Sequence, residues 1–200
     1  MIFSKKAEVV PEHLTEEEKK EIRIKSRMAL TWLGIVSIIM MFSGLTSGYI
    51  VRMDEGDWVR FEMPSVFYIS TAIILLSSLT MNYSLQSVKK GNLQGVKMGA
   101  LITLILGSLF SITQWLGWKD LVSNGIHFVG NPSGSFFYIL TGLHLVHLLV
   151  GLIALIIVSI KAAKNKYTLD NYLGLRICSL YWHFLDVLWV YLFLFLIYVK

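Results

Sequence analysis

Five long apolar stretches constrain this chain more than any other feature. Each contains about 20 residues or more, the length of an α-helix that crosses the hydrocarbon core of a bilayer. Only 16% of the 200 residues are charged, whereas a soluble domain carries about a quarter. The sequence therefore predicts an all-α fold, an integral membrane bundle of five transmembrane helices at residues 28–200, preceded by a polar N-terminal tail at residues 1–27. The predicted helices cover residues 28–51, 65–85, 96–115, 135–160 and 172–199.

The basic side chains are distributed unevenly between the two ends of these helices. Fourteen of the eighteen Lys and Arg residues lie before the first helix, between the second and third, or around the junction of the fourth and fifth. Cytoplasmic segments of membrane proteins are enriched in Lys and Arg. We therefore expect a cytoplasmic N-terminus and an external C-terminus. The net charge of +5 then reflects orientation in the membrane, and nucleic acid is not an expected partner.

The end of the polar tail carries a helix-start signal. Thr15 and Glu18 have the spacing of a capping box, in which each side chain satisfies a backbone N–H of the other residue. A short helix over residues 16–25 and a solvated charged tail are both compatible with this segment.

Asp186 is the only acidic residue inside any of the five apolar stretches. A charge at the centre of a membrane helix costs about 2.5–3.5 kcal/mol on insertion scales, so it seldom occurs there without a partner or a function. Arg176 and His183 share its helical face, and His144 and His147 lie on one face of the preceding helix. At 1.5 Å per residue, Asp186 and His147 lie about 20 Å from the same end of the bundle. The two polar faces are therefore expected to meet near mid-membrane.

Three interpretations of this cluster compete. It could bind a metal or haem, since His is the commonest metal ligand. It could relay protons, because ionisable groups inside a membrane are often functional. It could instead be a polar network that fixes helix packing or contacts a lipid or a partner subunit. We favour the third, because His144 and His147 have i, i+3 spacing rather than the i, i+4 spacing of helical metal sites.

Small residues indicate close helix packing but no chemistry. Gly44 and Gly48 have the small-xxx-small spacing that lets membrane helices approach closely. Gly142 and Gly151 on the fourth helix are further candidates for helix packing. The chain shows no nucleophile–base pair, so no catalytic residue is predicted.

Two motifs resemble subunit III of the haem–copper terminal oxidases. One is Phe137-x-x-x-x-Gly142-x-His144-x-x-His147-x-x-x-Gly151, and the other is Trp182-His183-Phe184-x-Asp186-x-x-Trp189. Weaker likenesses occur around Gly107 and Gly44. The motifs together extend over nearly the whole membrane part.

This resemblance implies a subunit of a bacterial cytochrome c or quinol oxidase, which reduces O₂ to water and pumps protons across the inner (plasma) membrane. Subunit III of that family packs on catalytic subunit I beside subunit II, binds phospholipid, and supports proton uptake and stable turnover. The haems and copper belong to the partner subunits, so the resemblance implies no metal and no redox cofactor in this chain. Such a complex can also join a larger respiratory supercomplex.

The alternative function belongs to a different class. A stand-alone membrane carrier or a b-type cytochrome would use the same cluster of His144, His147, His183 and Asp186.

The first helix departs from the family pattern at one position. Many members carry a membrane-buried Glu where this chain has Ile38, and no acid occurs anywhere from residue 28 to residue 51. A proton-collecting role of that Glu therefore does not transfer to this protein.

The charge distribution generates a prediction about topology. Single cysteines introduced at Ile2 and at Lys200, in a Cys178→Ser background, should differ in their reaction with a membrane-impermeant thiol reagent. In intact cells the C-terminal cysteine should be labelled and the N-terminal cysteine should be protected. Labelling of the N-terminal cysteine in intact cells would contradict the predicted orientation.

Overall fold

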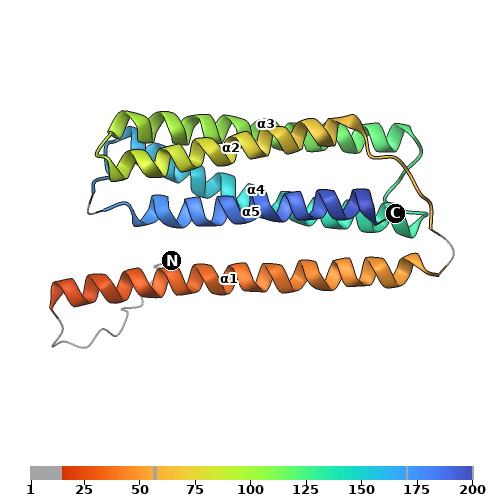
Figure 1. Ribbon diagram of the computed structural model, residues 1–200, viewed down its shortest axis with the longest axis horizontal. Helices are drawn as coiled ribbons and strands as arrows, with labels where there is room; N and C mark the ends of the chain where they lie inside the picture. The colour runs from red at the N-terminus through yellow and green to blue at the C-terminus, as the bar shows by residue number, and fades with distance from the viewer. Residues whose placement is uncertain (1–14, 56–57, 170, 200) are drawn as a thin grey trace, which may run out of the picture.

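The computed structural model describes residues 15–55, 58–169 and 171–199 and contains five long helices. They are α1 (Glu16–Met53), α2 (Ser65–Lys89), α3 (Leu93–Ser123), α4 (Pro132–Ala163) and α5 (Leu173–Tyr198). All five are long and apolar enough to cross a membrane. Successive helices run in opposite directions, so the start of α1 and the end of α5 lie at opposite ends of the bundle (Figure 1). The predicted all-α bundle of five membrane helices is confirmed.

The helices lie in three tiers. The first holds α2 and α3, the second holds α4 and α5, and α1 lies along the far side of the second tier (Figure 1). Among the described helices, α1 packs only against α4 and α5. Its buried positions, Ile35, Phe42, Thr46 and Tyr49, form one narrow stripe. Most of the surface of α1 therefore faces away from the rest of the chain.

Helix α1 begins twelve residues before the predicted membrane span. The Thr15 backbone N–H donates to Glu18 Oε2 at 2.8 Å, and the Glu18 N–H donates to Thr15 Oγ1 at 3.3 Å. This capping box starts a helix that continues without a break into the membrane span. Of the two alternatives for this segment, the structure has the helix. Residues 1–14 of the predicted polar tail lie outside the described residues.

Helices α2 and α3 approach each other closely along hydroxyl-bearing positions. The Ser84 hydroxyl donates to the carbonyl of Val96 at 3.0 Å, and the hydroxyls of Thr80 and Thr103 lie 2.8 Å apart. A Cβ added at Gly99 would lie 2.7 Å from Ser84 Cβ. Small and hydroxyl residues thus let the backbones of α2 and α3 approach closely. In lipid, such close packing and interhelical hydrogen bonds hold helices together, because no hydrophobic driving force acts between them.

The glycines predicted to pack helices divide into two groups. An added Cβ would meet nothing within 4 Å at Gly44 or Gly142, and only ordinary contacts at Gly48. At Gly151 it would lie 3.2 Å from Leu185 Cδ1. Neither Gly44 nor Gly142 therefore faces a helix of this chain closely enough for a methyl group to matter, and a packing role for them stays a prediction.

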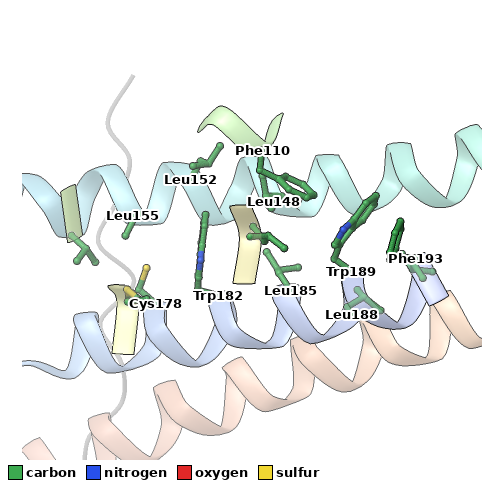
Figure 2. Packing of buried hydrophobic residues seen from close by; sticks show 14 of the residues in the cluster. Phe110, Leu148, Leu152, Leu155, Cys178, Trp182, Leu185, Leu188, Trp189 and Phe193 are labelled. Atoms are coloured by element: carbon green, nitrogen blue, oxygen red, sulfur yellow. The ribbon is translucent and has the colours of Figure 1, made fainter. Parts of the chain in front are cut away.

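Two indole side chains of α5 fill the centre of the bundle. Trp182 and Trp189 are buried and point from α5 toward Leu152 and Leu148 of α4, with Phe110 of α3 above them (Figure 2). Gly107 leaves the space for the first indole, since a Cβ there would lie 2.6 Å from Trp182 Cη2.

This contact predicts opposite effects for two matched substitutions. Gly107→Ala should lower the free energy of unfolding by about 1–3 kcal/mol, because the added methyl group overpacks the core against Trp182. Gly142→Ala should leave it unchanged or raise it by up to about 1 kcal/mol, because Ala is the better helix former and the space is open. Equilibrium unfolding in bicelles checks both variants. Equal effects of the two substitutions would contradict the packing described here.

Candidate functional site

Three side chains of α5 form hydrogen bonds with hydroxyl groups of α2. Trp182 Nε1 donates to Ser77 Oγ at 3.0 Å, and Trp189 Nε1 donates to Thr71 Oγ1 at 3.0 Å. Between them, His183 Nδ1 lies 2.7 Å from Ser78 Oγ. We call these three pairs the hydroxyl seam. Because lipid offers no hydrogen-bond partners, the seam gives each of these three side chains of α5 a partner inside the chain.

The hydroxyl seam connects α5 to a different helix from the one expected. The sequence predicts partners for His183 on the fourth helix, whereas the structure places Ser78 of the second helix beside it. Ser77, Ser78 and Thr71 were not predicted. The signal that could have found them is the seven-residue spacing of Thr71 and Ser78, with Ser77 next to Ser78, which puts hydroxyl groups on one side of α2.

Asp186 lies beside the middle of the hydroxyl seam. Its Oδ2 is 4.0 Å from His183 Nδ1, and its residue exposure is 2%. Neither carboxylate oxygen has a partner at full hydrogen-bond geometry within the described part of the chain, and the polar side chains that interact with it are those of His183 and Ser78. The His183 side chain is 34% exposed, so it is the member of this group that reaches the surface of the bundle. Asp186 lies thirteen residues from the start of α5 and twelve from its end, at the middle of the helix.

His144 and His147 face different neighbours. The His144 ring is fully buried, with its centroid 5.1 Å from that of Trp189 and 6.0 Å from that of Phe110. The His147 ring lies 6.0 Å from Phe42 of α1, and its Nδ1 lies 2.7 Å from the carbonyl oxygen of Leu143. The two imidazoles therefore do not converge on a common point. Residues 15–55, 58–169 and 171–199 contain no group of three or more His, Cys, Asp or Glu that could hold a metal ion.

Arg176 does not join the polar groups near mid-membrane. It is exposed in the first turn of α5, ten residues before Asp186, which corresponds to about 15 Å along the helix. The structure therefore separates Arg176 from His144, His147, His183 and Asp186, and the role of these residues as a lipid or subunit contact stays a prediction. The structure groups His183 and Asp186 with Ser78, and it directs His144 and His147 toward other helices.

A separate elongated pocket lies between α1, α4 and α5. Its volume is about 380 Å³. Along α4 it extends from Val150 to Lys161, a length of about 16 Å. Apart from Lys161, the α4 residues that line it are apolar; they are Val150, Ala154, Ile157 and Val158.

Two polar groups lie at the loop end of this pocket. Lys161 is in the last turn of α4, and Tyr167 is in the connection to α5. The Tyr167 hydroxyl is buried without a hydrogen-bond partner in the described part of the chain. Burial raises the pKa of Tyr167 to about 12, so its phenol remains a neutral hydrogen-bond donor at neutral pH. An apolar channel that ends at a cation and a neutral donor is suited to an amphipathic anion.

Comparison with known proteins identifies relatives for most of the chain. The profile of the family described as cytochrome c oxidase subunit III matches residues 59–200. A cytochrome c oxidase subunit 3 from Corynebacterium diphtheriae is 30% identical over 164 residues, which cover 78% of this chain and 80% of that protein. A protein of the same name from Bacillus sp. (strain PS3) is 30% identical over 182 residues, covering 88% and 87% of the two chains.

The divergence of the two α4 imidazoles generates a prediction. The purified chain should contain no stoichiometric metal by elemental analysis and should show no haem absorption, because His144 and His147 cannot ligate one centre in this arrangement. His127→Ala, in an exposed loop outside these groups, serves as the control. Stoichiometric metal that is lost in His147→Ala and retained in His127→Ala would contradict the prediction.

Proposed function

Because this chain belongs to the cytochrome c oxidase subunit III family, we propose that it is the non-redox subunit of a proton-pumping respiratory oxidase that reduces O₂ to water. It packs on catalytic subunit I beside subunit II in the inner membrane of a bacterium, with its N-terminus in the cytoplasm. The haems and copper are held by those partners. The observation that carries this proposal is the hydroxyl seam, in which the Trp182–Trp189 motif binds another helix of the same chain.

The exposed part of the seam supports a contact with another subunit. His183 and Ser78 form a hydrogen-bonded polar pair on a surface where the nearby residues Leu75, Leu79 and Val187 are exposed and apolar. Lipid tails cannot satisfy the second imidazole nitrogen of His183, whereas a polar group on a neighbouring membrane helix can. The alternative of a stand-alone carrier or b-type cytochrome requires the four polar residues to act together. It gains no support, since the imidazoles of His144 and His147 are turned toward different helices.

The pocket between α1, α4 and α5 supports the binding of a phospholipid. An acyl chain fits the apolar wall from Val150 to Val158, and a phosphate group would reach Lys161 and the phenol of Tyr167. The same lipid would fill the space between α1 and the second tier. In this way it would hold α1 in place and support stable turnover of the complex.

Native mass spectrometry of the detergent-extracted complex tests this proposal. The chain should be released together with larger oxidase subunits and should retain bound phospholipid. Lys161→Gln keeps a polar side chain of moderate length but removes the positive charge. It should therefore reduce lipid retention severalfold without dissociating the subunits. Lys164→Gln, outside the pocket, is the matched control. A chain that extracts alone, or equal lipid retention in both variants, would contradict the corresponding part of the proposal.

Asp186→Asn should weaken assembly more than it alters chemistry. The substitution keeps the shape of the side chain and removes a carboxylate that has no partner at full hydrogen-bond geometry in the described part of the chain but lies 4.0 Å from His183 Nδ1. We expect easier dissociation of this subunit or faster inactivation during turnover. The initial rate of O₂ reduction should stay within about twofold of wild type, a change of about 0.4 kcal/mol in the barrier.

Asp120→Asn, at the exposed end of α3, is the control for this prediction. If the Asp186→Asn complex remains intact but its initial rate falls more than about tenfold, equivalent to about 1.4 kcal/mol, Asp186 takes part in the reaction path. The structural role proposed for Asp186 would then be wrong.

A further inference from the structure

Gln114 of α3 and His144 of α4 are among the polar side chains that have no hydrogen-bond partner in the part of the chain that the structure describes. Both the amide nitrogen and the amide oxygen of Gln114 are unpaired, and so are both ring nitrogens of His144. Gln114 is 1% exposed and His144 is 0% exposed. Neither side chain can reach lipid headgroups or a partner subunit from these positions. Whatever satisfies them must therefore lie inside the chain itself.

Neighbouring contacts place Gln114 opposite His144. Gln114 lies between Phe110 and Trp118 on one face of α3, four residues from each. On one side of it, the Phe110 ring meets the His144 ring at 6.0 Å. On the other side, Trp118 Nε1 donates to Thr141 Oγ1 at 3.1 Å. Since Thr141 and His144 are one turn apart on α4, Gln114 lies on the face of α3 that packs against this part of α4.

Direct contact between these two side chains would not satisfy them. A neutral imidazole has one donor and one acceptor, and an amide has two donors and an acceptor oxygen. One Gln–His hydrogen bond would leave the second imidazole nitrogen and one end of the amide unpaired. The Thr141 hydroxyl donates to the carbonyl of Phe137 at 2.8 Å and accepts from Trp118, and it bonds to neither Gln114 nor His144.

We infer that this site binds a water molecule between Gln114 of α3 and His144 of α4. Water both donates and accepts, and buried waters in proteins form about three hydrogen bonds to polar groups that would otherwise be unpaired. The surrounding side chains include Phe110 and Trp189, which offer no charge to attract an ion. A small neutral ligand with both donor and acceptor capacity is therefore the class that the site fits.

The bound water positions the hydroxyl seam through His144. The imidazole of His144 lies 5.1 Å from the indole of Trp189, whose Nε1 donates to Thr71 of α2. A water bonded to His144 fixes the orientation of this ring, and the ring forms one wall of the space that holds Trp189. The site thus links α3 and α4 directly and supports the contact between α5 and α2 indirectly.

High-resolution cryo-electron microscopy of the wild-type complex tests the inference directly. The map should show a density peak within hydrogen-bond distance, about 3.2 Å or less, of both Gln114 and His144. A map that shows the two side chains bonded directly to each other, or an empty space between them, would overturn it. This measurement needs no variant and so does not depend on whether a substituted chain folds.

A double-mutant cycle in the same complex gives an independent readout. Gln114→Leu and His144→Leu should each lower the melting temperature of the full chain by several degrees, because each leaves the water with an incomplete set of partners. The double variant should lose less than the sum of the two single losses. Gln86→Leu, at an exposed position of α2, controls for the general effect of replacing an amide. Single variants that melt at or above the wild-type temperature, with additive effects, would overturn the inference.

Discussion

The hydrogen bonds between α5 and α2 are the interaction on which the rest of the bundle depends. An indole N–H or an imidazole in hydrocarbon has no solvent to bond, so it must find its partner within the protein. Trp182, His183 and Trp189 each find one on α2. These bonds fix the rotation of α5, and that rotation places both indoles in the centre of the bundle and Asp186 beside the seam. Gly107 on α3 and Gly151 on α4 then supply the space that the indole of Trp182 occupies.

Helix α1 is organised on a different principle from the other four. It has one narrow buried stripe and, among the described helices, it packs against those of the second tier, so much of its surface is available to lipid or to another subunit (Figure 1). Tyr49 anchors its C-terminal end, where its hydroxyl donates to the carbonyl of Val199 at 3.1 Å and its ring packs on Trp58 and Phe195. Toward the other end, the pocket beside Lys161 and Tyr167 separates α1 from α4 and α5. A bound lipid could fill the pocket and join α1 to α4 and α5, which agrees with the function proposed for the pocket.

The sequence predicted the number and type of helices because twenty-residue apolar stretches have few alternative structures. The start of α1 is also indicated in the sequence, because the capping box is formed by Thr15 and Glu18, which are only three residues apart. The sequence failed to predict the partners of His183. The count of residues from the membrane surface gives the depth of a side chain but not the neighbouring helix that it faces. Adjacency in sequence favours α4 as the neighbour of His183, whereas the imidazole bonds to Ser78 of α2. Likewise, the spacing of Gly44 and Gly48 resembles a packing motif, whereas a close contact occurs at Gly107, where the opposing residue is Trp182.

The most direct test of the hydroxyl seam is a double-mutant cycle between Trp182 and Ser77. Trp182→Phe and Ser77→Ala, measured singly and together by equilibrium unfolding in bicelles, report the coupling between the two side chains. Interhelical hydrogen bonds in membranes are worth about 0.6–1.7 kcal/mol, so a coupling of this size is expected. The exposed Ser108, whose hydroxyl bonds only within its own helix to the carbonyl of Leu104, provides the control partner, and Ser108→Ala should show no coupling to Trp182→Phe. A coupling between Trp182 and Ser77 no larger than that of the control pair would contradict the account.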